Sequence, residues 1–391
     1  MIDQQTSEEI ISLYKGWHEI EKSNKIDIID FDLVPEIKGI KVKSREEVLR
    51  RLKYLHSSFE PETKQEVFIK AKLDASIYLL RALMDEEIPY TLYVEKITGV
   101  TPEIIDEKII ERQYERTYEL MLKAGYKPSR QTLKEFIETL KMSKEEATRR
   151  EKICELEIVP IFKKALGFEN VKPVFTTDYV EEDDYWKGWS STKSDGTFWL
   201  RFNFHPMVDW YKGEMQILPT HEIAHFVHGA NLKQGIQEGR INPAIGVTTV
   251  YEPHTFAGEG TANGVLDIAE VEKEFSKFGL LAREQRVTTS YLLNNAHIRV
   301  NEGEDIDKLV EYILERSPFA NAKRYRRILE LCRDNPTRRG YVYVYGYTRK
   351  KHREFQQMLT PGQFLVYLNH AMSTYETPKQ LMAFVNQLAR R

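Results

Sequence analysis

A run of twelve residues near the middle of the chain, residues 218–229, constrains the fold and the chemistry more than any other stretch. It reads LPTHEIAHFVHG and holds three histidines and one glutamate. From Ile223 to Ala230, apolar residues recur at i, i+3, i+4 and i+7, which predicts an amphipathic helix. The apolar residues thus have a face of their own, and the histidines need another explanation.

Two of these histidines, His221 and His225, are four positions apart. On a helix such residues share one face, with Cβ atoms about 5–6 Å apart, so both imidazoles can bind one ion. Glu222 lies beside them. A catalytic zinc site takes about three protein ligands and leaves one position for water. The run therefore predicts a metal-binding helix with a third ligand elsewhere. A structural metal, or no metal, remains the alternative.

Glu259 is the candidate for that third ligand. It stands in the segment AGEGTANGV, residues 257–265, and Ala262, Val265 and Leu266 follow it at helical spacing. This places Glu259 in the first turn of a second helix, where the flanking glycines let another backbone approach closely. Glu259 follows His225 by 34 residues, which is enough for a connection and an antiparallel return.

Together these residues resemble the gluzincin class of zinc metallopeptidases, in which HExxH is joined by a downstream glutamate. HEIAHFVHG is similar to the HExGHxxH form of thimet-oligopeptidase-like enzymes, and GEGTAN is similar to the E-G-W-A segment of related helical gluzincin families. Ala224 and Thr261 replace the usual Gly and Trp of these patterns. The resemblance covers residues 185–360, and it implies a mainly α fold with a small β-sheet beside the HExxH helix.

The resemblance also implies a mechanism, namely hydrolysis of peptide bonds in short peptides. Zinc would be bound by His221, His225 and Glu259, and it would activate a water for which Glu222 is the general base.

These families place a tyrosine late in the chain near the oxyanion, and residues 340–350 read GYVYVYGYTRK. The Y-x-x-G spacing selects Tyr343 as the catalytic phenol, with Tyr345 and Tyr347 as alternatives. Alternating tyrosines are equally typical of a half-buried strand or helix edge. For His228 we expect a hydrogen bond to a carboxylate or carbonyl near the site, whereas His254 either lines the site or binds metal or substrate.

Helical periodicity dominates residues 1–170, and we expect this region to wall or cap a cleft in a catalytic domain formed by residues 171–391. Residues 198–204 alternate between apolar and polar, after turn residues Ser194, Asp195 and Gly196, which predicts a β-hairpin. The strand at residues 197–203 either pairs with an extended substrate or is purely structural.

The amino-acid composition limits the classes of partner that the protein is expected to bind. The net charge is −3 with 30% charged residues, so no chain-wide positive charge favours nucleic acid. The sequence contains no run of about 18 apolar residues and no export signal at its start, which predicts a cytoplasmic protein without membrane contact. The two cysteines, Cys154 and Cys332, are expected to be reduced and buried.

Residues 323–353 depart from this balance, with eleven Lys and Arg against two acids. Three interpretations remain open: a solvated face, capture of a substrate carboxylate with Arg349 best placed, or binding of nucleic acid. The alternative functions are therefore a zinc hydrolase acting on a non-peptide amide and a nucleic-acid-binding or partner-binding protein. The sequence predicts no oligomeric state.

Overall fold

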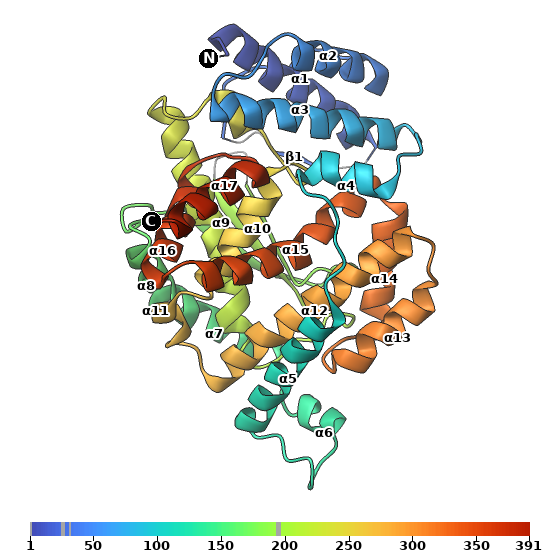
Figure 1. The fold of residues 1–391 in the computed structure, drawn as a ribbon, viewed down its shortest axis with the longest axis vertical. Coiled ribbons are helices and arrows are strands. Elements are labelled where there is room, and N and C mark those ends of the chain that lie inside the picture. The colour runs from blue at the N-terminus through green and yellow to red at the C-terminus, as the bar shows by residue number, and fades with distance from the viewer. Residues whose placement is uncertain (1, 25–27, 31–32, 193–196) are drawn as a thin grey trace.

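The computed structural model describes residues 2–24, 28–30, 33–192 and 197–391. The chain is mainly helical with two small sheets, which confirms the predicted fold class (Figure 1). None of the described helices combines the length and the apolar composition needed to cross a bilayer.

The N-terminal helices stack at one end of the molecule, at the top of Figure 1. They are α1 (Gln4–Ser23), α2 (Arg45–Ser57), α3 (Lys64–Leu83) and α4 (Tyr90–Thr98). The apolar stripe of α1 is buried, since Ile10, Tyr14 and Trp17 are at most 1% exposed. A capping box between Thr63 and Glu66 fixes the start of α3. These helices therefore form where the helical periodicity predicts them.

The next four helices lead to the sheet: α5 (Glu107–Ala124), α6 (Leu133–Glu138), α7 (Lys144–Glu157) and α8 (Val159–Ala165). α7 packs against the histidine-bearing helix, where the Cys154 Sγ atom lies 3.0 Å from the Thr220 hydroxyl. Cys154 and Cys332 are both buried and unpaired, as expected.

The larger sheet has the strand order β2-β4-β3. Its strands are β2 (Phe175–Val180), β3 (Gly188–Thr192) and β4 (Phe198–Asn203), with β2 parallel and β3 antiparallel to β4. The antiparallel β3–β4 pair is the predicted hairpin, while its expected turn residues 194–196 lie outside the described residues. A second sheet pairs β1 (Ile29–Asp30) with β5 (Thr248–Thr249).

The remaining chain is helical almost to its end. Its elements are α9 (Glu214–Gln237), a 3-10 turn (Pro243–Gly246), α10 (His254–Val265), α11 (Ala269–Glu272), α12 (Lys277–Asn301), α13 (Ile306–Arg316), α14 (Ala322–Asp334), α15 (Pro336–Met358), α16 (Pro361–Ser373) and α17 (Pro378–Ala389). Figure 1 shows α9, α10 and α15 near the centre of the molecule. The tyrosine-rich segment 340–350 lies within α15 and is helical throughout.

The sheet is held against α9 by aromatic packing. Phe198 on β4 stacks on Phe226 of α9 with ring centroids 4.7 Å apart, and Phe175 on β2 contacts the same ring. The inward side chains of β4, Phe198, Leu200 and Phe202, are at most 8% exposed, as their period-two pattern predicts. This packing places the edge strand β3 beside α9.

The apolar core joins residues on both sides of position 170. One cluster combines Trp17 and Phe68 of the N-terminal helices with Tyr251 and Tyr375, and another combines Phe162 of α8 with residues of α9 and β4. The N-terminal region thus shares its packing with the residues that follow it.

Candidate metal centre

The two predicted metal-binding histidines lie on one face of α9. His221 is 3% exposed, His225 is half-buried, and their Nε2 atoms are 3.2 Å apart. The opposite face packs into the core through Ile223, Phe226 and Val227, each at most 1% exposed. The helix therefore has the two faces that its sequence predicts.

Glu259 reaches these histidines from α10. Its Oε2 atom lies 3.4 Å from His221 Nε2, and its Oε1 atom lies 3.9 Å from His225 Nε2. Because α10 begins at His254, Glu259 stands in the second turn of the helix rather than the predicted first turn. At Gly260, a Cβ atom would collide with the ring of His352 on α15. This glycine lets α10 approach α15 closely.

The three side chains fit a metal ion. One ligand atom from each lies within 4.8 Å of the other two. Burial lowers the pKa of His221 well below its usual value and lowers the pKa of His225 to about 4, so both imidazoles are neutral at pH 7. Glu259 has no Lys or Arg partner, and its buried Oε2 lacks a hydrogen bond, within the described part of the chain. Two neutral imidazoles and a carboxylate without a cation match the donor set of zinc.

Asn263 supports the orientation of His221. It stands one turn after Glu259 on α10, and its side chain acts on His221 as a hydrogen-bond partner that opposes the lowering of the pKa by burial. The Nδ1 atom of His221 and the Oδ1 atom of Asn263 have no strict hydrogen bond among the described residues. Metal-binding histidines commonly donate their second N–H to an oxygen, and Asn263 supplies the nearby side chain for that role.

Glu222 lies beside the two histidines and is 7% exposed. Burial, followed by the charge of Glu259, raises the pKa of Glu222 to about 7, while the hydroxyl of Ser190 on β3 opposes this rise. A Cβ atom at Gly188 would lie 3.2 Å from the Glu222 carboxylate, so the glycine leaves room for it at the sheet edge. The predicted general base therefore has a pKa near the operating pH that proton transfer requires.

Two tyrosines of α15 point toward the metal-binding group. The Tyr341 hydroxyl donates to Glu259 Oε1 at 3.1 Å, and the Tyr345 hydroxyl donates to that of Tyr341 at 2.7 Å. Burial and the charge of Glu259 raise the pKa of both phenols well above the usual value, so both keep their protons at neutral pH. Helical i, i+4 spacing brings these two residues to one face.

The structure does not bring Tyr343, the predicted catalytic phenol, into contact with the metal-binding group. Its hydroxyl accepts a hydrogen bond from the backbone N–H of Glu103 at 2.9 Å, and its ring is fully buried against Tyr347. A residue two positions from Tyr341 and Tyr345 lies on the other side of a helix. The helical period groups Tyr341 with Tyr345 and Tyr343 with Tyr347, and the packing of α15 directs the first pair to the metal-binding group.

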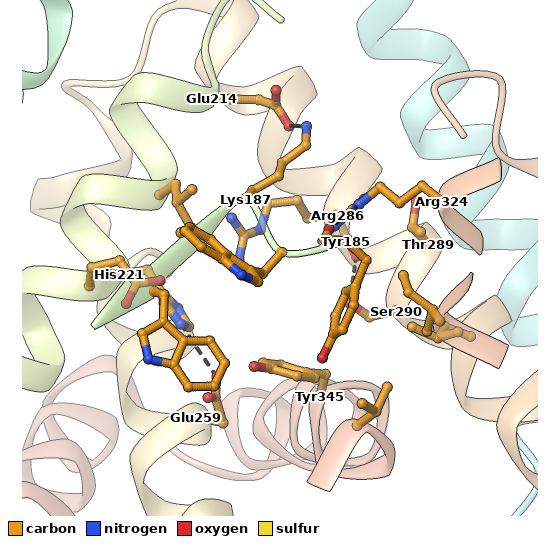
Figure 2. Close-up of a pocket in the computed structure, with 18 of the residues that line it drawn as sticks. Tyr185, Lys187, Glu214, His221, Glu259, Arg286, Thr289, Ser290, Arg324 and Tyr345 are labelled. Atoms are coloured by element: carbon orange, nitrogen blue, oxygen red, sulfur yellow. Dashed lines mark hydrogen bonds and ion pairs between the residues drawn. The ribbon is translucent and has the colours of Figure 1, made fainter. Parts of the chain in front are cut away.

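The metal-binding group opens into a cavity of about 250 Å³. Around it, Figure 2 shows side chains from α9, α10, α12, α14 and α15 and from the segment that leads into β3. Described lining residues include His221, Glu222, Tyr345, Trp189 and Arg286, and they begin at Tyr185. The described lining of the cavity therefore contains no residue of the N-terminal helices, which stack at one end of the molecule.

Three cations among the described residues line this cavity. Arg324 belongs to the basic 323–353 segment that the sequence indicates, whereas neither Lys187 nor Arg286 was singled out from the sequence. Lys187 is paired with Glu214 at 2.6 Å, as the dashed line in Figure 2 marks. Arg286 on α12 and Arg324 on α14 also line the cavity. Burial lowers the pKa of His221 and raises that of Glu222, and the charge of Arg286 lowers both pKa values. Arg286 is therefore close to the metal-binding group.

His228 and His254 form a separate pair away from the cavity lining. Their ring centroids are 4.7 Å apart, and His254 stacks on Tyr375 at 4.1 Å. Burial, followed by the charge of His225, lowers the pKa of His228 to about 3. The Nε2 atom of His228 does not form the expected bond to a carboxylate or carbonyl, since it is buried without a partner among the described residues.

Arg349 does not line the cavity, contrary to the expectation that it could bind a substrate carboxylate there. It is 3% exposed, and burial lowers its pKa to about 9. Other basic residues of the 323–353 segment are paired within the protein: Lys350 with Glu103 and Glu354, Arg353 with Glu284, and Arg333 with Asp334. This pairing weighs against a continuous nucleic-acid surface, while Arg324 shows that part of the segment does reach the cavity.

Comparisons with known proteins provide a fold likeness. No protein-family model and no curated protein matches the chain. A crystal structure described as that of a putative lipoprotein from Colwellia psychrerythraea superposes with a TM-score of 0.59 at 15% sequence identity. The match covers 92% of this chain and 72% of the other. At this identity the likeness concerns the fold alone.

Proposed function

We propose that the protein is a zinc-dependent metallopeptidase that hydrolyses short peptides. The observation that carries the proposal is the convergence of His221, His225 and Glu259, with Glu222 beside them, at the wall of a cavity. Zinc bound to these three residues would polarise the scissile carbonyl and bring the pKa of a water to about 7. The other steps belong to side chains of the protein itself.

Glu222 acts as the general base. Its carboxylate lines the cavity next to the metal ligands, and its position on α9 directs it toward β3. It takes the proton of the attacking water and passes it to the leaving amine. A raised pKa suits both steps, because the group must accept and then release a proton near neutral pH.

Tyr345 is the phenol that we assign to the oxyanion. Tyr341 is committed to Glu259, and a hydrogen bond to a carboxylate is stronger than one to a neutral group. Tyr345 donates only to the neutral Tyr341 hydroxyl, so redirecting its O–H toward a developing oxyanion costs less. Tyr341 then serves to hold the Glu259 carboxylate in place.

The edge strand β3 is the surface that we assign to the peptide backbone. Of the two alternatives for the strand at residues 197–203, pairing with substrate is excluded, because β4 lies between β2 and β3 and uses both edges. β3 pairs only with β4 in its sheet, and its Trp189 and Ser190 line the cavity. An extended peptide can add to such an edge through backbone hydrogen bonds. This feature favours a peptide over other amides.

A peptide-library digest followed by mass spectrometry tests the proposal. Wild-type protein loaded with zinc should cleave a subset of the library, and Glu222→Gln should lower the rate by about 100-fold or more while retaining zinc. Absence of cleavage by the zinc-loaded wild type, or an unchanged rate in Glu222→Gln, would contradict the proposal.

A further inference from the structure

Arg286 is a cation in the wall of the cavity. Among the described residues, no carboxylate forms an ion pair with its guanidinium and no acceptor forms a hydrogen bond with it. The side chain is half-buried in the cavity wall. A partly desolvated charge without a partner is costly, and an anionic ligand would offset that cost.

Two carboxylates around the cavity already have partners, and Glu222 forms no ion pair with Arg286 among the described residues. Lys187 is bonded to Glu214, and Asp209 is held by Lys141 at 3.3 Å and by an amide N–H of Asn321 at 3.3 Å. Neither carboxylate is therefore free to neutralise an arginine. A metal ion bound to His221, His225 and Glu259 would neutralise the Glu259 carboxylate, so Glu259 could not also pair with Arg286.

Arg324 presents a second guanidinium to the same space. Its Nε donates to the Tyr185 carbonyl at 2.6 Å, which fixes the orientation of the planar group. Within the described residues its terminal nitrogens have no acceptor, and the side chain lines the cavity together with Arg286 (Figure 2). A planar guanidinium can bind both oxygens of a carboxylate through parallel hydrogen bonds.

We propose that Arg286, assisted by Arg324, binds a carboxylate of the peptide substrate beside the metal centre. This subsite rests on the proposed peptidase function and specifies its substrate class. The carboxylate comes either from the C-terminus of the peptide or from an Asp or Glu side chain near the scissile bond. The two arginines come from α12 and α14, so the subsite and the metal ligands on α9 and α10 face the same cavity from different elements.

Binding to zinc-loaded Glu222→Gln protein tests this subsite without hydrolysis. Calorimetry would compare three N-acetylated tripeptides: one with a free C-terminal carboxylate, its C-terminal amide, and an amide whose last residue is Asp. Hydrogen bonds to charged groups predict a dissociation constant about tenfold or more lower for a carboxylate-bearing peptide than for the plain amide. The first and third peptides separate the two sources of the carboxylate.

Substitutions assign the preference to the arginine. In the Glu222→Gln background, Arg286→Gln should bring the carboxylate and amide peptides to equal affinity, and Arg286→Lys should restore part of the difference. Arg327→Gln, at an exposed position on α14, is the matched control and should keep the full preference. Thermal melting of each variant checks that it is folded.

Three results would overturn the subsite. Equal affinity of all three peptides for the Glu222→Gln protein excludes it, and so does an unchanged preference in Arg286→Gln. If Arg286→Gln weakens acid and amide peptides by the same factor, the arginine supports the shape of the cavity and does not bind a substrate carboxylate. In each case cleavage by the wild type would leave the peptidase function standing. Absence of both cleavage and peptide binding would reject the function and the subsite together.

Discussion

The cavity wall and the interior next to it contain the same residue types, but in different electrostatic settings. In the wall, His221 and His225 face Glu259, which has no Lys or Arg partner among the described residues. In the interior, His254, which packs against His228, stands two residues after a glutamate that already has a cation partner. That residue, Glu252, lies 3.3 Å from the amine of Lys72.

This difference shows which histidines are available for a ligand. Lys72 and Glu252 are each 1% exposed, and burial lowers the pKa of the lysine and raises that of the glutamate. Within the described residues, the interior histidines and their charged neighbours thus have no opening for a ligand, and His254 is stacked on Tyr375. The cavity set combines neutral imidazoles with an unneutralised carboxylate and access to a cavity. Residue type alone does not distinguish the two regions, whereas charge balance and access do.

The largest difference in activity is expected between variants on the two faces of α15. Tyr345→Phe removes the phenol assigned to the oxyanion and should lower kcat by about 100-fold with little change in KM or zinc content. The matched interior variant, Tyr343→Phe, removes the acceptor of the Glu103 N–H and should cost about 1 kcal/mol of stability with kcat almost unchanged. Steady-state kinetics and urea unfolding measure both. The reverse pattern would return the oxyanion role to Tyr343.

A smaller effect is expected from Tyr341→Phe, because Tyr341 acts on a metal ligand and not on the substrate. Loss of its hydrogen bond to Glu259 should weaken zinc binding by about tenfold, in the range typical of groups that support metal ligands. Competition with a fluorescent zinc chelator measures this affinity. Unchanged affinity together with a 100-fold loss of kcat would instead make Tyr341 the oxyanion donor.

The sequence was most informative where helical period decides the geometry. It predicted the apolar stripe of α9, the shared face of His221 and His225, and Glu259 on a second helix, and the structure brings these three side chains together. It did not identify the tyrosines that face the metal-binding group. Residues two apart diverge on a helix, and the packing of α15 decides whether Tyr341 with Tyr345 or Tyr343 with Tyr347 lies on that side.

Arg286 could not be identified from the sequence for a different reason. It stands in α12 between helical neighbours, and no local pattern distinguishes it from other surface cations. Its position in the cavity depends on how α12 packs against α9, α14 and α15. Likewise, the parallel pairing of β2 with β4, which makes β3 the edge strand, depends on contacts distant in sequence. Tertiary packing decides such features, and periodicity does not contain them.

Histidines inside and outside these two regions predict a smaller, pH-dependent effect on stability. Burial lowers the pKa of His225 to about 4, and that of His228, His297 and His352 to about 3, from an ordinary value of 6.5. A lowered pKa means that the folded protein keeps these groups neutral while the unfolded chain takes up protons below pH 6.5. Their stabilising contribution is therefore complete above pH 6.5 and is lost as the pH falls.

Urea unfolding of the zinc-free protein between pH 6.5 and 4.5 measures this loss. Each such histidine should contribute a slope of up to about 1.4 kcal/mol per pH unit, and His297→Leu should flatten the curve by about one such increment. The carboxylates of Glu66 and Glu284, whose pKa values are lowered to about 2, contribute mainly below this window. A free energy of unfolding that stays constant over the window would show that the folded histidines are protonated.

Zinc content tests the distinction between the two regions most directly. After saturation with zinc and extensive dialysis, the wild-type protein should retain about one zinc per chain by inductively coupled plasma mass spectrometry. The double variant His221→Ala, His225→Ala should retain none, while the interior variant His228→Ala, checked for folding by its thermal melt, should retain about one. Full zinc occupancy in the double variant, or loss of zinc from folded His228→Ala alone, would contradict the assignment of the metal centre to the cavity wall.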